Sequence, residues 1–326
     1  MRIIVDGFGG DNAPLATLQG CELAINEYGV DITVTGNEQV LKKVAQENNI
    51  DISKMKIVHA NSVIPVEADP TTILKEYKDS SMAVAFQLLA NGEGDAVVCA
   101  GSTGAIVVGA SLIVKRIKGI KRAALAPIMP ADKGCYILMD VGANVECRPE
   151  MLLQFGVMGS IYMEKIMNVP NPRVAIVNIG SEETKGRDLE LGAYKLFSDS
   201  KFINFTGNIE PRYIPAGDAD VVITDGFTGN VILKLTEGLG KMFANNIKNI
   251  FGGFVGTMAG AMVLKKIKAF KNKMDYTEYG GAPLLGTAKP VIKAHGSSNA
   301  KAFKNAIRQA RDFVEKGVID EISSSI

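Results

Sequence analysis

The stretch Asp220-Val-Val-Ile-Thr-Asp-Gly-Phe-Thr-Gly-Asn230 decides the fold class of this chain. Its first half is a short, β-branched apolar run that ends in an acidic residue, which is typical of a buried strand. Gly-Phe-Thr-Gly-Asn then predicts a loop, and a helical pattern begins at Val231 and continues over 231–251. A strand that passes directly into a helix leaves backbone N–H groups directed outward at the helix N-terminus, and such groups suit an anion such as phosphate.

The same passage from strand to helix occurs at five further places along the chain. Apolar strands separated by helices predict a mostly parallel, doubly wound sheet covered on both faces, which is a three-layer α/β/α sandwich. Ligands of such folds bind at the carboxyl ends of the strands. No linker, repeat or low-complexity tract interrupts the pattern, so we expect one catalytic domain over residues 1–326. The predicted strand and helix pairs are 3–6 with a helix ending near Tyr28, 31–35 with 38–48, 95–100 with 105–115, 136–141 with a helix that has Pro149 in its first turn, and 173–179 with 187–197.

The composition of the chain argues against a nucleic-acid partner, a metal site and a membrane-spanning helix. The formal net charge of the 326 residues is +1, so no global field favours a nucleic acid and no nucleic-acid partner is expected. With only two histidines and four cysteines that lack zinc-site spacing, we expect no metal site. The chain enters a strand at its first residues and contains no uncharged apolar run of the roughly 18–20 residues that span a bilayer, which predicts a cytoplasmic protein.

The familiar phosphate-binding motifs are absent. Gly7-Phe-Gly-Gly-Asp-Asn12 has asparagine where a dinucleotide fingerprint needs its third glycine, and the chain contains no Walker A sequence. This argues against a bound dinucleotide and against a P-loop kinase. We therefore expect no cofactor.

Several loops of small residues remain as candidates for an anion site: 101–104, 142–144, 228–230 and 295–299. Each offers backbone N–H groups together with hydroxyl or amide side chains, which can surround a tetrahedral oxyanion. A single such loop more often serves backbone geometry, but four together favour an anion site. The candidate phosphate- or substrate-binding residues are Asp6, Gly9, Gly10, Asn12, Ser102, Thr103, Gly104, Asn144, Asp225, Thr228, Gly229 and Ser297.

Three residues are candidates for catalysis. Lys185 stands beside a glycine in a strand-end loop, where its charge would neutralise a phosphate; the alternative is a solvated lysine paired with a neighbouring glutamate. Asn230 is expected beside the Thr228 and Gly229 amides at a helix N-terminus, where it would stabilise an oxyanion. His295 would donate to the same oxyanion or relay a proton, or it would simply hydrogen-bond a loop carbonyl.

The segment 251–276 departs from the α/β pattern. Val263, Ile267, Phe270 and Met274 fall within roughly 40° of one another on a helical wheel, and lysines flank this stripe. A narrow apolar stripe bordered by lysines is typical of an amphipathic helix that lies in a lipid interface. The alternative is an ordinary surface helix that packs on the body of the protein or on a partner subunit.

Seven motifs stand in order along the chain. They are Asp6-Gly-Phe-Gly-Gly-Asp-Asn-Ala-Pro14, Ala100-Gly-Ser-Thr-Gly-Ala105, Asp140-Val-Gly-Ala-Asn-Val-Glu-Cys147, Asn178-Ile-Gly-Ser-Glu-Glu-Thr-Lys-Gly186, Asp225-Gly-Phe-Thr-Gly-Asn-Val231, Tyr279-Gly-Gly-Ala-Pro-Leu-Leu-Gly286 and Lys293-Ala-His-Gly-Ser-Ser-Asn299. Together they resemble the signatures of one bacterial family, the acyl-ACP:phosphate acyltransferases (PlsX family). The chain departs from that pattern at Pro211 and Tyr213, where the family has Gly and Asp, so no role is carried over to their loop. Gly7-Phe8 also replaces Ala-Met, and Ser102 replaces Asn.

The resemblance implies a fold similar to phosphotransacetylase and isocitrate dehydrogenase, a homodimer, and peripheral contact with the inner face of the cell membrane. It implies conversion of acyl-[acyl carrier protein] (acyl-ACP) and inorganic phosphate to acyl-phosphate and free ACP. That product would feed phosphatidic acid and phospholipid synthesis through a downstream glycerol-3-phosphate acyltransferase. The basic run 115–122 is a candidate surface for the acidic ACP. The alternatives are a phosphotransacetylase that uses acyl-CoA, a decarboxylating dehydrogenase on the related fold, and a non-catalytic membrane scaffold that binds ACP.

Overall fold

The computed structural model describes residues 1–251 and 280–326. The segment predicted over 251–276, with its four proposed membrane-contact residues, therefore lies outside the described residues except for Phe251. Those four residues are Val263, Ile267, Phe270 and Met274.

The larger sheet of the described residues has seven strands in the order β3-β2-β1-β4-β12-β11-β5. The first five strands in this order run parallel to their neighbours, whereas β11 runs antiparallel to both β12 and β5. The strand β12 enters between β4 and β11 although it lies far from β4 in sequence. The strands are β1 (Arg2–Asp6), β2 (Asp31–Gly36), β3 (Met55–His59), β4 (Ala96–Cys99), β5 (Ala124–Leu125), β11 (Ala282–Leu285) and β12 (Val291–Lys293).

The smaller sheet has five strands in the order β6-β7-β10-β8-β9. Only its edge strand β6 is antiparallel to its neighbour, β7. The sequence predicted β7, β8 and β10 but not the edge strands β6 and β9. It also did not predict the division between two sheets, because strand runs do not show which strands are hydrogen-bonded to one another. The strands are β6 (Ile128–Pro130), β7 (Cys135–Met139), β8 (Arg173–Val177), β9 (Asn204–Ile209) and β10 (Val221–Ile223).

Helices cover both faces of the larger sheet, as its alternating side chains require. On β1, Ile3 and Val5 are buried in one apolar cluster with Phe303, whereas Ile4 is buried in another with Phe86. The three-layer α/β prediction is therefore confirmed. The helices are α1 (Leu15–Tyr28), α2 (Glu38–Glu47), α3 (Ser81–Ala90), α4 (Thr103–Gly109), α5 (Pro149–Lys165), α6 (Asp188–Asp199), α7 (Gly226–Ile250), α9 (Ala300–Glu315) and α10 (Val318–Ser324), with short helical turns η1 (Pro70–Leu74), η2 (Ala110–Val114) and η3 (Pro211–Ala216).

Both clusters of buried apolar side chains contain residues of both sheets. Ile3 of β1 and Ile137 of β7 share the first cluster, and Ile4 and Leu138 share the second. The single catalytic domain over residues 1–326 stays a prediction.

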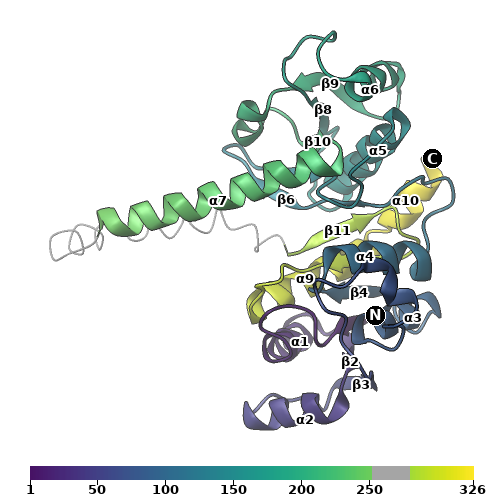
Figure 1. The fold of residues 1–326 in the computed structure, drawn as a ribbon, viewed down its shortest axis with the longest axis vertical. Helices are drawn as coiled ribbons and strands as arrows, with labels where there is room; N and C mark the ends of the chain where they lie inside the picture. The colour runs from purple at the N-terminus through teal and green to yellow at the C-terminus, as the bar shows by residue number, and fades with distance from the viewer. Residues whose placement is uncertain (252–279) are drawn as a thin grey trace.

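The helix α7 starts earlier than the sequence pattern indicated. It begins at Gly226, with Asp225 as its N-cap, rather than at Val231. The predicted Gly-Phe-Thr-Gly-Asn loop therefore forms the first five residues of the helix. From there α7 runs outward, and its C-terminal half extends beyond both sheets (Figure 1).

Candidate active site

A cavity of about 310 Å³ lies where strand ends of both sheets meet the first turns of α7. From the larger sheet, the carboxyl ends of β4 and β12 lead into it, since these strands are parallel neighbours. From the smaller sheet, the segment after β7 and the strand β6 contribute. The residues that line it are Thr103, Leu125, Pro127, Ile128, Met129, Val141, Gly142, Asn230, Leu233, Lys234, Glu237, Gly280, Gly281, Ala282, Lys293 and His295.

The cavity brings together three of the residues predicted from the sequence. Thr103 is the first residue of α4, Asn230 lies in the second turn of α7, and His295 follows β12. These residues are far apart in sequence and come from three separate elements. Their hydroxyl, amide and imidazole groups are all able to donate hydrogen bonds to one bound oxyanion.

The hydrogen bonds of His295 fix its tautomer. Its Nδ1 accepts the backbone N–H of Ser297 at 3.2 Å and lies 2.8 Å from the Ser297 hydroxyl oxygen. In the neutral ring the proton is therefore on Nε2, which lies 3.8 Å from Glu237 Oε1. Burial lowers the pKa of His295, Glu237 opposes this, and Lys293, Lys234 and Lys241 add to the lowering. The ring is accordingly neutral near pH 7 and is an N–H donor at Nε2.

Lys293 is a cavity residue whose role the sequence reasoning missed. It is the last residue of β12 and is half-buried. Within the described part of the chain, its ammonium group makes a long contact of 3.5 Å with the Ala294 carbonyl oxygen. Burial lowers its pKa, and the positive charge of Lys234 lowers it further, whereas Cys99 and Glu237 act in the opposite direction. Its place in the Lys-Ala-His motif is the signal that would have drawn attention to it.

Lys234 and Glu237 were also missed, although helical spacing relates them to Asn230. Residues four and seven positions along a helix lie on the same face as the first, so a helix beginning at Gly226 places all three toward the cavity. Lys234 Nζ pairs with Glu237 Oε2 at 2.9 Å, and the Glu237 side chain is only 12% exposed. The pair is therefore internally neutral.

Apolar residues also line the cavity. They are Leu125 of β5, Ile128 and Met129 of β6, and Leu233 of α7. A cavity whose lining combines hydrogen-bond donors with apolar residues suits a ligand that has a charged end and a hydrocarbon end.

The predicted residues at the end of β1 do not line this cavity. Asn12 donates from Nδ2 to the carbonyl oxygens of Ser297 and Ser298, each at 3.2 Å, which ties the loop after β1 to the loop that carries His295. Asp6 is buried at the strand end and accepts the Phe8 N–H at 3.2 Å. Burial raises its pKa, and hydrogen bonds from Ser81, Phe8 and Gly9 oppose this. Asn12 thus supports the loop that carries His295. The predicted residues that lie outside the cavity lining are Asp6, Gly9, Gly10, Asn12, Ser102, Gly104, Asn144, Lys185, Asp225, Thr228, Gly229 and Ser297.

Asp140 and Asn144 form a buried support beneath the cavity. Asp140 accepts N–H bonds from Leu125 at 2.9 Å and from Asn144 at 2.6 Å. Asn144 in turn donates from Nδ2 to the Ala123 carbonyl oxygen at 2.8 Å, and its own carbonyl oxygen accepts the Gly226 N–H at 2.8 Å. Burial raises the pKa of Asp140 to about 6, although the N–H donors act in the opposite direction because they stabilise the carboxylate. The side chains thus position the start of α7.

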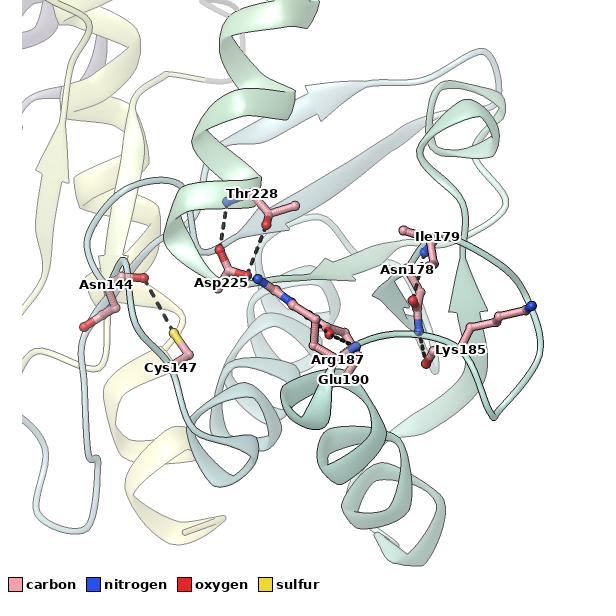
Figure 2. A network of polar contacts seen from close by, with 9 residues as sticks. All are labelled: Asn144, Cys147, Asn178, Ile179, Lys185, Arg187, Glu190, Asp225 and Thr228. Carbon is pink, nitrogen blue, oxygen red and sulfur yellow. Dashed lines mark hydrogen bonds and ion pairs between the residues drawn. The ribbon is translucent and has the colours of Figure 1, made fainter.

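The Thr228 and Gly229 amides, which we expected to face an anion, already have partners. Asp225 Oδ1 accepts the Thr228 N–H at 2.8 Å as an N-cap, and the Asp225 carbonyl oxygen accepts the Gly229 N–H at 3.0 Å. Arg187, which the sequence reasoning did not single out, forms an ion pair with Asp225 Oδ2 at 2.6 Å (Figure 2). The expectation that Asn230 stands beside two open amides is therefore wrong, because the helix starts before those amides.

Lys185 lies on the loop after β8 and is exposed. Its carbonyl oxygen accepts a hydrogen bond from Asn178 Nδ2 at 2.9 Å, and its side chain points away from the Arg187–Asp225 pair (Figure 2). The structure does not bring it to the cavity that holds Asn230 and His295. Its role in phosphate binding stays a prediction.

A metal cluster and a membrane-spanning helix are both missing from the described ranges. Over residues 1–251 and 280–326, no cluster of three or more His, Cys, Asp or Glu side chains is arranged to hold a metal ion. No helix in the same ranges combines the length and apolar character that crossing a bilayer requires.

Solved structures with similar folds include phosphotransacetylases. The phosphotransacetylase of Streptococcus pyogenes superposes with a TM-score of 0.66 at 17% sequence identity, covering 97% of this chain and 94% of that one. The EutD phosphotransacetylase of Staphylococcus aureus gives a TM-score of 0.63 at 16% identity, covering 100% and 94%. At this level of identity the likeness concerns the fold.

Sequence comparison identifies the family. The sequence model described as "Fatty acid synthesis protein" matches residues 1–321. The chain is 47% identical over 328 residues to the phosphate acyltransferase of Clostridium novyi, covering 100% of this chain and 98% of the relative. It is 46% identical over 327 residues to that of Alkaliphilus oremlandii, covering 100% and 97%. The chain therefore belongs to the fatty acid synthesis protein family, as its motifs predicted, and it is an enzyme of the phosphate acyltransferase class.

Proposed function

We propose that this enzyme transfers an acyl group from acyl-ACP to inorganic phosphate. A phosphate oxygen attacks the thioester carbonyl carbon, the new C–O bond forms, and the C–S bond breaks. The electron pair leaves with sulfur as the thiolate of ACP, which takes its proton from water, and the product is acyl-phosphate. The observation that carries the proposal is the mixed lining of the cavity, which combines hydrogen-bond donors with apolar residues.

The hydrogen-bond donors that line the cavity suit the tetrahedral intermediate of this reaction. Asn230 and neutral His295 offer N–H groups from two different elements to the developing oxyanion. A fixed donor of this kind contributes roughly 3–4 kcal/mol to transition-state stabilisation. Phosphate is already an anionic nucleophile, so the site needs no strong base. Its main task is to hold the two reactants in line, which is worth up to about 7–11 kcal/mol.

The apolar residues of the cavity suit the hydrocarbon end of the acyl group. Leu125, Ile128, Met129 and Leu233 are in the lining, and burying a methylene group contributes about 0.8 kcal/mol. This favours a fatty acyl chain over an acetyl group, and it separates the proposal from the acetyl-CoA chemistry of a phosphotransacetylase.

ACP is an acidic partner, and the basic run 115–122 offers a surface for it. Within this run Ile117 and Ile120 are buried and anchor the segment, whereas Lys115, Lys118 and Lys121 are exposed. Charge complementarity of this kind steers association and fixes orientation.

A homodimer through α7 belongs to the same proposal. The exposed apolar side chains of α7 include Val231, Leu235, Leu239 and Met242, each at least 42% exposed. At 100° per residue these four lie within about 80° on one side of the helix, away from the cavity-facing Asn230 and Glu237. A second copy of α7 would cover them. We further propose a cytoplasmic location with peripheral contact to the cell membrane through Val263, Ile267, Phe270 and Met274. The acyl-phosphate product would then pass to a glycerol-3-phosphate acyltransferase.

The decisive experiment measures thiol release from two donors. Long-chain acyl-ACP and acetyl-CoA are each incubated with the enzyme, with and without inorganic phosphate, and free thiol and acyl-phosphate are quantified. We expect phosphate-dependent release from acyl-ACP and little from acetyl-CoA. Preference for acetyl-CoA would indicate a phosphotransacetylase, and release from neither donor would favour a non-catalytic scaffold.

A further inference from the structure

The cavity contains a positive charge that no described carboxylate neutralises. Lys293 lies in the wall, and its ammonium group has no carboxylate oxygen within the 4.0 Å of an ion pair among residues 1–251 and 280–326. Its recorded hydrogen bond, to the Ala294 carbonyl oxygen, is 3.5 Å long. A partly desolvated charge is costly unless it is paired, so this lysine suits an anionic ligand.

Glu237 lines the same cavity and already has partners. It pairs through Oε2 with Lys234 at 2.9 Å, and its Oε1 lies 3.8 Å from His295 Nε2. Thr103 and Asn230, which also line the cavity, are neutral. With His295 neutral, the charges of Lys234 and Glu237 cancel, so among the described lining residues the charge of Lys293 remains.

The position of Lys293 is rigid and central. The strand β12 is hydrogen-bonded between β4 and β11, and Lys293 is paired in register with Cys99 of β4. Its side chain therefore starts at the carboxyl end of a central strand, where ligands of α/β sheets bind. Lys185, by contrast, starts from an exposed loop and does not line the cavity.

We propose that Lys293, in place of Lys185, binds the tetrahedral anion in this cavity, and that the anion is inorganic phosphate. The ammonium group neutralises part of the phosphate charge, while Thr103 and Asn230 donate to other phosphate oxygens. This assignment rests on the proposed function for the identity of the anion. The anion site itself rests on the unpaired lysine and the donors around it.

The test measures inorganic phosphate binding by isothermal titration calorimetry and the KM for phosphate in the thiol-release assay. The variants are Lys293→Met, Lys293→Arg, Lys185→Met and, as a matched control that removes one lysine charge from the exposed face of α6, Lys195→Met. Hydrogen bonds to charged groups correspond to about 10- to 100-fold in affinity. We expect Lys293→Met to raise both the Kd and the KM for phosphate by that factor, Lys293→Arg to restore part of the loss, and Lys195→Met to leave both within twofold. Near-UV circular dichroism checks that each variant is folded.

The two readouts separate failure of this inference from failure of the proposed function. If the wild-type enzyme releases thiol from acyl-ACP but folded Lys293→Met keeps its phosphate KM and Kd within twofold, the assignment of Lys293 is wrong while the function stands. A loss confined to Lys185→Met would give the anion to Lys185 and would also overturn the assignment. If the wild-type enzyme binds phosphate without turning over acyl-ACP, and Lys293→Met abolishes that binding, the anion site stands and the acyl donor must be sought elsewhere.

Discussion

Replacing Gly229 with alanine tests whether the close packing of α7 against Asp140 and Thr224 sets the geometry of the cavity. A Cβ at this position would lie 1.9 Å from the Asp140 carbonyl oxygen and 2.9 Å from Thr224 Cγ2. Real Cβ atoms essentially never approach another atom closer than 3.0 Å. The helix and the end of β7 must therefore separate by about 1 Å to accept a single methyl group.

We expect a large fall in rate together with a small fall in Tm. Asn230 is the next residue, and Lys234 and Glu237 lie on the same face of α7, so a shift of the helix moves all three relative to Lys293 and His295. A displacement of about 1 Å costs roughly 100-fold in rate. Overpacking of this kind costs roughly 1–3 kcal/mol, which corresponds for a chain of this length to a fall in Tm of roughly 2–4 °C.

The assay is phosphate-dependent thiol release measured well below the Tm, together with calorimetric melting. Gly240→Ala is the matched control, because it lies on the same helix and a Cβ there meets nothing within 4 Å. Alanine is favoured over glycine in a helix by about 1 kcal/mol, so this control should keep the wild-type rate and melt at the same or a slightly higher temperature. Wild-type activity in Gly229→Ala would refute the reasoning that the contact between α7 and the end of β7 positions Asn230 in the cavity.

Two further predictions concern pH and assembly. Asp140 has a folded pKa raised to about 6, above its unfolded value of about 4, so its contribution to stability is present below about pH 4 and is lost as the pH rises through about 6. The Tm of the wild type relative to Asp140→Asn should therefore fall between pH 4 and pH 6, and a constant difference would contradict the pKa assignment. Leu235→Asp, on the exposed apolar side of α7, should yield a monomer by light scattering if α7 forms the dimer interface, whereas Ala244→Asp, which points roughly the opposite way on the helix, should not; a dimer in both variants would place the interface elsewhere.

Strand–helix units could be predicted from the sequence because each β-branched run ends at a small-residue turn. The run before Asp225 is an example, and β10 and α7 are found there. The start of α7 was placed five residues late because glycines at 226 and 229 suggested a loop. The acidic residue three positions before Thr228 was the stronger signal, since aspartate is a preferred N-cap whose side chain accepts that amide proton.

The meeting of Thr103, Asn230 and His295 followed from the rule that ligands bind where strands end. The contribution of Lys293 did not follow, because nothing local to 291–293 shows that β12 lies between β4 and β11. Asp6 and Asn12 show the converse limit. Their residue types suit an anion site, and that role stays a prediction. In the structure Asn12 holds the loop that carries His295, a task that a polar side chain in a turn does not reveal from the sequence.

The charges around the cavity favour phosphate as a nucleophile over water. Among the described residues that line the cavity, Lys293 leaves one positive charge, because Lys234 and Glu237 neutralise each other at 2.9 Å and burial keeps His295 neutral. A phosphate anion would be attracted to such a site, whereas neutral water would gain little from it. Activating water for hydrolysis of the thioester would require a base, yet His295 uses Nδ1 to accept the Ser297 amide proton and presents a proton at Nε2. The imidazole is thus arranged to donate to an oxyanion and not to remove a proton from water, so the same hydrogen bond that orients His295 also disfavours hydrolysis.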